Sequence, residues 1–102
     1  MLIESNEIAL DLWQIIAHHG YDNQKHKAIE EFSELTEQLA RDLNGQGDRA
    51  HIAEEMADSY MMLGQLELIY GNHTDVVVFV REKLQRTLIR INAERSGEVK
   101  TT

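Results

Sequence analysis

The chain has 102 residues, 18 acidic and 10 basic side chains with a formal charge of −8, and neither cysteine nor proline. This length fits one domain, and the lack of cysteine excludes disulfide frameworks, zinc fingers, iron–sulfur sites and thiol nucleophiles. The negative charge argues against proteins that bind a nucleic-acid strand or an anionic membrane surface, because both kinds of binding need clustered Lys and Arg. Hydrophobic residues make up 42%, which is enough for a folded core and excludes a disordered acidic tail.

The first residues and the apolar runs predict a cytoplasmic protein. Met1-Leu2-Ile3-Glu4 is acidic at once, where a signal peptide would carry basic residues before an apolar stretch. The longest apolar run, Val76–Val80, is far too short to cross a bilayer. We therefore expect neither a membrane nor a nucleic-acid strand among the partners.

Few glycines and no proline predict long helices with few interruptions. A first helix is expected from about Ser5, a possible N-cap, to the stop at His18-His19-Gly20. A second helix should cover roughly residues 22–43, because its apolar positions recur at helical spacing. These positions are Ala28, Ile29, Phe32, Leu35, Leu39 and Leu43.

The segment 44–48 interrupts this pattern and predicts a tight connection between antiparallel helices. A third helix is expected over about residues 48–70, with a stripe formed by Ile52, Met56, Ser59, Leu63, Leu66 and Tyr70. After a break at 71–74, capped by Asn72 or Thr74, a fourth helix should carry Val77, Val80, Leu84, Leu88 and Ile91.

The segment Val76–Val80 by itself would suit a strand, but the helical spacing continues through Ile91 and favours a helix. Residues 93–102 are expected to form a frayed tail. The predicted fold class is therefore all-α, a four-helix, bundle-like arrangement. It is expected as a single domain over residues 1–95, with a flexible C-terminal tail over 96–102.

Two pairs of carboxylates stand out because each has helical i, i+3 spacing: Glu31 with Glu34, and Glu55 with Asp58. In an antiparallel hairpin centred near residues 45 and 46, all four lie at similar height. Converging carboxylates repel one another unless a cation lies between them or their protons stay on. Oxygen ligands without cysteine suit Mg²⁺, Mn²⁺ or Ca²⁺ better than zinc.

Acidic runs on helices are usually solvated faces, and this is the alternative interpretation of the two carboxylate pairs. The stripe through Glu55 and Asp58 continues as Met62, Leu66 and Ile69, which a solvated face should not do. We therefore expect the carboxylates to point into a partly buried cleft. A di-iron bundle is excluded by its own signature, because no His has a Glu three residues before it. A calcium loop ranks low for want of loop-borne Asp and Asn ligands.

The motif Glu30-Glu31-x-x-Glu34 followed by Glu55-x-x-Asp58 resembles the EExxE…ExxD signature of the MazG-type nucleotide pyrophosphohydrolases. The resemblance to this all-α NTP pyrophosphohydrolase superfamily runs from about Trp13 to Arg90. The stretch from Gln24 through Leu35 is similar to small stand-alone members, many of them encoded by phages.

The resemblance implies Mg²⁺-dependent hydrolysis of a nucleoside triphosphate to the monophosphate and pyrophosphate, with Mn²⁺ as a possible substitute. It makes Glu31, Glu34, Glu55 and Asp58 the metal ligands, and Glu30 an additional motif carboxylate. The metal would neutralise the triphosphate and lower the pKa of a bound water, and a spare carboxylate could take the proton. Glu30 and Glu34 are the predicted catalytic residues.

The remaining predicted site residues would contact the substrate. The resemblance suggests phosphate contacts on the last helix, where Lys83, Arg86 and Arg90 share one stripe but Thr87 replaces the family's Asn. A solvated surface is the alternative for that stripe. Lys27 is either a phosphate contact or, the favoured interpretation, an i, i+4 ion-pair partner of Glu31.

Base recognition has several candidates. Trp13, Tyr21 or Phe32 could stack on a base, and Gln24, Asn23 or His18 could hydrogen-bond to one. Of these, Trp13 and Gln24 are taken as predicted substrate contacts, although a Trp in an amphipathic helix is more often a core residue.

The third helix is apolar on more than one side, with Met61, Gly64 and Leu68 opposite the side of Met62 and Ile69. A chain of this size has too few helices to cover these surfaces, which predicts a homo-oligomer. The resemblance supports that expectation and implies a homodimer or homotetramer. The competing hypothesis for function is a non-catalytic, acidic helical module that binds a protein partner through these apolar faces.

Overall fold

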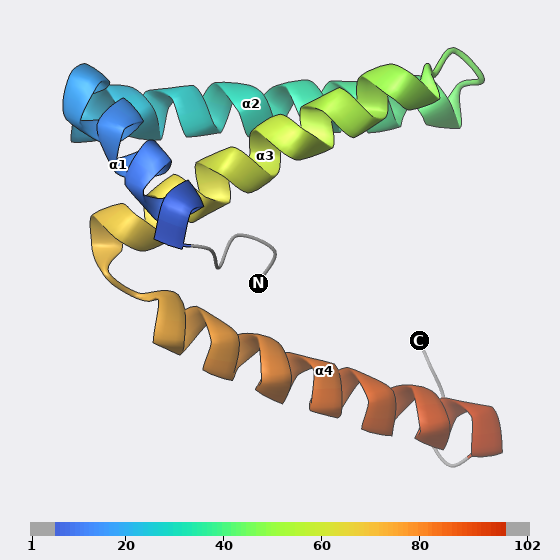
Figure 1. Cartoon of the computed structure of the whole chain (residues 1–102). Coiled ribbons are helices and arrows are strands. Elements are labelled where there is room, and N and C mark those ends of the chain that lie inside the picture. Colours follow the sequence, from blue (N-terminus) through green and yellow to red (C-terminus); the bar gives the residue numbers. More distant parts are fainter. Residues whose placement is uncertain (1–5, 98–102) are drawn as a thin grey trace. The chain divides into compact units, whose positions relative to one another are not determined.

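The computed structural model describes residues 6–97, and these residues form four α-helices and no strand. The helices are α1 (Asn6–His19), α2 (Tyr21–Leu43), α3 (Arg49–Tyr70) and α4 (His73–Ser96) (Figure 1). The predicted all-α class is confirmed, and Val76–Val80 is helical. The predicted cap Ser5 and the tail residues 98–102 lie outside the described residues. The prediction of a tail beginning at residue 93 is wrong for 93–96, because α4 continues through Ser96.

The helix ends follow local backbone chemistry. Gly20 separates α1 from α2 with φ +93°, and Gly71 ends α3 with φ +61°, both in the region that favours glycine. Asp48 begins α3, because its carboxylate accepts hydrogen bonds from the backbone N–H groups of Ala50 and His51. Asn72 occupies the cap position of α4, without a side-chain cap hydrogen bond, and Thr74 lies inside that helix.

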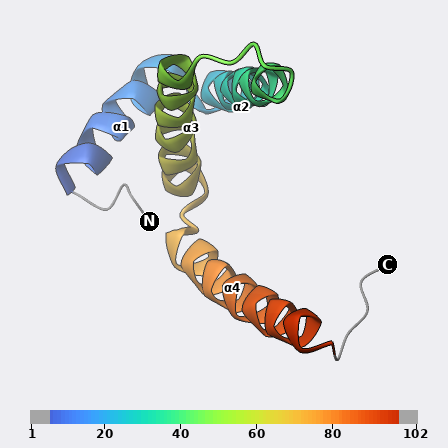
Figure 2. The ribbon, with the colours of Figure 1, turned by 90° about the vertical axis from the view of Figure 1, so that its right-hand side faces the viewer.

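The chain divides into two compact units, Met1–Gly71 and Asn72–Thr102. In the first unit, α2 and α3 form an antiparallel hairpin, and α3 lies between α1 and α2 (Figure 2). The second unit contains α4, which has no buried side chain. The expectation of a single domain over residues 1–95 stays a prediction. Among the helices of residues 6–97, none has the length and apolar character needed to cross a membrane.

The interior of the first unit is polar as well as apolar. Among the described residues, the buried apolar side chains are Leu12, Ile16, Ala28 and Met62, and the buried polar ones are Gln24, Glu31, Glu55, Ser59 and Gln65. Buried polar groups need hydrogen bonds. Ser59 donates a hydrogen bond to the backbone carbonyl of Glu55 at 2.9 Å. The carboxylates of the two buried glutamates pair with basic side chains instead. The polar residues line the contact between α2 and α3, which places the candidate site there.

The face of α3 that packs against α2 differs from the predicted apolar stripe. Of that stripe only Ser59 is buried, while Met56, Leu63 and Tyr70 are exposed. The buried positions of α3 are Glu55, Ser59, Met62 and Gln65. Periodicity finds where apolar side chains lie on a helix, but it does not select the face that meets a neighbouring helix. The apolar stripe is therefore left on another side of the hairpin.

Candidate metal centre

Three carboxylates converge where α2 and α3 pack together: Glu31 and Glu34 from α2, and Glu55 from α3. One oxygen of each lies within 4.8 Å of the others, a spacing that could hold a metal ion. Glu31 and Glu55 are each only 7% exposed, and Glu34 is half-buried. The predicted convergence of these three side chains is therefore present in the structure.

Each buried glutamate has one oxygen paired with a basic side chain one turn earlier on its own helix. Lys27 Nζ lies 3.0 Å from Glu31 Oε1, and His51 Nε2 lies 3.1 Å from Glu55 Oε1. The pKa of Lys27 is raised, first by its hydrogen bond to Glu31 and then by the charge of Glu30, which favours its charged form. These pairings hold the two carboxylates in place.

The second oxygen of each buried glutamate has no such partner. Glu31 Oε2 and Glu55 Oε2 are both buried and make no hydrogen bond. A buried charged group without a partner costs about 1–3 kcal/mol or more, so the site favours a species that neutralises these oxygens. A divalent cation or a proton on a neighbouring carboxyl meets that need. The residues present therefore fit a hard cation bound by oxygen ligands.

The fourth predicted ligand, Asp58, lies beside this group and not in it. It is exposed, and it is not among the three residues whose oxygens lie within 4.8 Å of one another. The pKa of Asp58 is nevertheless raised, first by partial desolvation and then by the charges of Glu31 and Glu55. Asp58 therefore shares its charge environment with the cluster while its side chain remains open to solvent.

Two pairings across the hairpin share one register. Gln24 of α2 donates to Gln65 of α3 at 2.7 Å, and Glu34 of α2 converges with Glu55 of α3. Both pairs are symmetric about the bond between residues 44 and 45, one residue before the predicted centre. Of the four carboxylates predicted to converge, Glu31, Glu34 and Glu55 do so, and Asp58 does not join them.

The pKa of Glu34 reflects the repulsion between the clustered carboxylates. This pKa is raised, first by the charge of Glu31, then by burial, and then by the charge of Glu55. A raised pKa means that the folded chain holds a proton on Glu34 at a pH where the unfolded chain has lost it. The same sign applies to Asp58.

We expect the stability of the metal-free protein to fall as the pH rises from the ordinary carboxyl values, 4.5 for Glu34 and 3.8 for Asp58, through their raised values. In that window the folded chain binds more protons than the unfolded chain, so the free energy of unfolding decreases with pH. Urea unfolding in EDTA between about pH 4 and 7 measures the slope. Glu34→Gln should make this slope shallower. Glu54→Gln, which removes an exposed carboxylate next to Glu55, should leave the slope unchanged. An equal slope in both variants would contradict the assignment.

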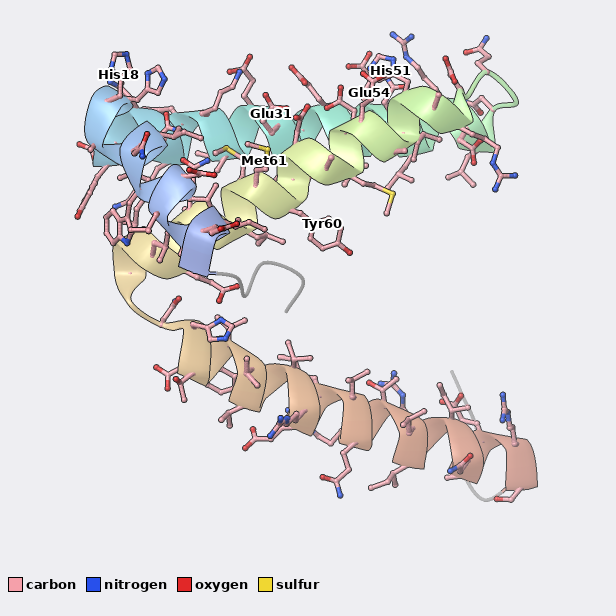
Figure 3. The ribbon with its side chains drawn as sticks, in the orientation of Figure 1. His18, Glu31, His51, Glu54, Tyr60 and Met61 are labelled. Carbon is pink, nitrogen blue, oxygen red and sulfur yellow. The ribbon has the colours of Figure 1, made fainter. Side chains whose placement is uncertain are left out.

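A cavity of about 500 Å³ lies beside the carboxylates, within the range of small-molecule sites. Glu31 of α2 and Met61 of α3 both line it, and Figure 3 shows Tyr60 projecting from the opposite side of α3. The cavity walls come from α1, α2 and α3. They are formed by Ile15, His19, Asn23, Gln24, His26, Lys27, Glu30, Glu31, Asp58, Met61, Met62 and Gln65.

The structure distributes the other predicted site residues unevenly. Glu30 is exposed and lines the cavity without joining the three-carboxylate group. Lys27 also lines it and makes the favoured ion pair with Glu31. Gln24 is buried at the cavity. Trp13 is not among the lining residues; its ring packs against that of Tyr21 with centroids 6.5 Å apart.

The predicted basic residues of α4 lie in the second unit. Lys83, Arg86 and Arg90, together with Thr87, line an open hollow of about 440 Å³ along that helix. Arg90 Nε lies 3.9 Å from Glu94 Oε1, an exposed pairing of little energetic weight. The three side chains thus share one face of α4, as the spacing predicts, and their role as substrate contacts stays a prediction.

Two residues of the site were missed by sequence reasoning. His51 has the same position before Glu55 as Lys27 has before Glu31, so a base–acid spacing repeated in both helices was the available signal. Gln65 is a polar residue in an otherwise apolar part of α3, and it is 2% exposed. A polar side chain at a buried helical position indicates a specific partner.

The comparisons identify no family for this chain. It matches no protein-family model, and searches of the curated proteins and of the solved structures found no match. The chain is an all-α protein with four helices in its described residues. Its cluster of Glu31, Glu34 and Glu55 could hold a metal ion.

Proposed function

We propose that the protein is a Mg²⁺-dependent hydrolase that converts nucleoside or deoxynucleoside triphosphates to monophosphates and pyrophosphate. The observation that carries the proposal is the pair of buried, unpartnered oxygens, Glu31 Oε2 and Glu55 Oε2, beside Glu34, with Glu31 also lining the cavity. The resemblance of the carboxylate motif to MazG-type enzymes supports the same reaction. Nucleotide-pool housecleaning or phage nucleotide metabolism would use this activity.

Glu31, Glu34 and Glu55 would hold the cation, with Asp58 beside them as the fourth carboxylate. When bound, Mg²⁺ or Mn²⁺ would neutralise phosphate charge and lower the pKa of a bound water. The chain's own contribution is positioning, because Lys27 and His51 each hold one oxygen of a buried glutamate. Groups that orient ligand side chains in this way typically change metal affinity or activity by about 10–100-fold.

Glu30 and Glu34 are the proposed catalytic carboxylates. Glu30 lies on the cavity wall outside the three-carboxylate group, which leaves it available to accept the proton of the attacking water. Glu34 belongs to the converging group, so its carboxylate would lie next to the proposed cation and could also orient the attacking water.

The proposed substrate contacts at the cavity are Lys27 and Gln24, together with Trp13, which lies two residues before the lining residue Ile15. The proposed phosphate contacts are Lys83, Arg86 and Arg90. A homodimer or homotetramer is proposed as the active form. Its support is an apolar hollow of about 230 Å³ on the α2–α3 hairpin, lined by Leu35, Met56, Ser59, Tyr60 and Leu63. Burying such a surface against a second copy would remove apolar area from water.

The proposal is tested by incubating the protein with the common NTPs and dNTPs in Mg²⁺ and separating the products. Release of pyrophosphate with the matching monophosphate, abolished by EDTA, is the expected result. Release of orthophosphate alone would place the cleavage at a different bond and contradict the proposal. Cleavage of no nucleotide would leave the acidic interaction module as the better description.

A further inference from the structure

Two glutamine side chains face each other at the buried wall of the cavity. Gln24 of α2 is 6% exposed and Gln65 of α3 is 2% exposed, and Gln24 Nε2 donates a hydrogen bond to Gln65 Oε1 at 2.7 Å. Both residues line the cavity that also contains Glu31 and Asp58. The amide pair therefore shares one space with Glu31 of the cluster and with Asp58 beside it.

The pair has further hydrogen-bonding capacity. Each glutamine side chain carries one carbonyl oxygen and one amide group with two N–H donors. The observed bond does not use the Gln24 carbonyl or the Gln65 amide nitrogen. The pair can thus offer an acceptor next to a donor.

We infer that the Gln24–Gln65 pair binds the hydrogen-bonding edge of a nucleobase. The inference rests on the proposed function, because the carboxylate end of the same cavity would take the phosphates. Every nucleobase presents a donor beside an acceptor on its pairing edge. Ile15, Met61 and Met62 supply apolar surface to the same cavity, as a flat heterocycle requires.

The symmetry of the amide pair sets what it can distinguish. If both amides rotate together, Gln65 becomes the donor and Gln24 the acceptor, and the order of the two remaining groups is exchanged. The pair then fits a base edge of either polarity. We therefore expect weak selection among the four bases, within about tenfold, but strong selection against a triphosphate that lacks a base.

Calorimetric binding in Mg²⁺ tests this inference without relying on turnover. The ligands are the α,β-imido analogues of ATP, GTP, CTP and UTP, in which the proposed scissile bond is blocked, and inorganic tripolyphosphate. Gln65→Met keeps the side-chain length and removes the amide of residue 65, both its oxygen and its nitrogen. It should weaken the nucleotide analogues about tenfold or more and change tripolyphosphate affinity less than about twofold. Gln14→Met, an exposed change on α1, is the matched control.

The outcomes separate the inference from the proposed function. If Gln65→Met weakened the binding of nucleotide and of tripolyphosphate equally, the pair would have only a structural role, and the inference would be overturned. The inference would also be overturned if the wild-type protein preferred tripolyphosphate or bound no nucleotide. Base-dependent binding that the variant loses, in a protein that cleaves nothing, would support the inference and refute the hydrolase. Gln24→Met repeats the test if Gln65→Met does not fold.

Discussion

Replacing Glu55 by glutamine is expected to lower metal-dependent pyrophosphate release by about 10²–10³-fold, the loss typical when one preorganised electrostatic group is removed. Glu55 is 7% exposed, belongs to the converging group and has one buried oxygen without a partner. Glutamine keeps the size of the side chain but replaces the anionic carboxylate by a neutral amide, whose single carbonyl oxygen binds a cation more weakly. The measurement is kcat/KM for the best nucleotide of the panel, at several Mg²⁺ concentrations.

The adjacent residue supplies the matched control. Glu54 is exposed and lies outside the group, so Glu54→Gln removes the same charge from the same helix without touching the site. Its activity should stay within about twofold of the wild type, because exposed charges away from a site interact weakly through water. Equal losses in Glu54→Gln and Glu55→Gln would show that overall charge matters and would refute the assignment of Glu55.

Metal binding should stabilise the wild-type fold and do so much less in Glu34→Gln. A cation that binds only the folded chain at about 100 times its dissociation constant adds about 2.7 kcal/mol. For a domain of this size that stabilisation corresponds to a rise of roughly 10–20 °C in the thermal midpoint. Differential scanning calorimetry with and without Mg²⁺ or Mn²⁺ measures the rise.

Glu34→Gln should also shift the metal-free protein in the opposite direction. The repulsion that raises the pKa of Glu34 disappears with its charge, and no basic partner is left behind, so the metal-free midpoint should rise. The control is Glu37→Gln on the same helix, whose carboxylate pairs with Arg41 at 2.8 Å on the surface. It should retain the full metal response. A metal response of the same size in Glu34→Gln would exclude Glu34 as a ligand.

Local signals were enough to place the helices. Gly20, Asp48 and Gly71 mark ends where the backbone requires a positive φ or a side-chain cap, and these requirements depend on neighbouring residues alone. The tail was predicted to begin too early, at residue 93. Apolar periodicity stops at Ile91, while the helical backbone hydrogen bonds continue to Ser96. A polar helical turn has no periodic signal to extend the prediction.

The carboxylate cluster could be predicted because it depends on two short spacings and one hairpin. The i, i+3 pairs put Glu31 with Glu34 and Glu55 with Asp58, and a short turn brings the two helices level. The amide pair could not be predicted in this way. Whether Gln24 meets Gln65 depends on the rotation of each helix about its axis and on a register shift of one residue.

By itself, the sequence determined the all-α class, the positions of the helices and the acidic spacing, because these follow from interactions within a few residues of the chain. Only the tertiary structure decided that α3 turns Glu55, Met62 and Gln65 toward α2 while Met56 and Leu63 remain exposed. It also decided that Asp58 stays open to solvent beside Glu31. Helix rotation depends on which side chains can pack and pair across an interface, and that condition involves residues far apart in the chain.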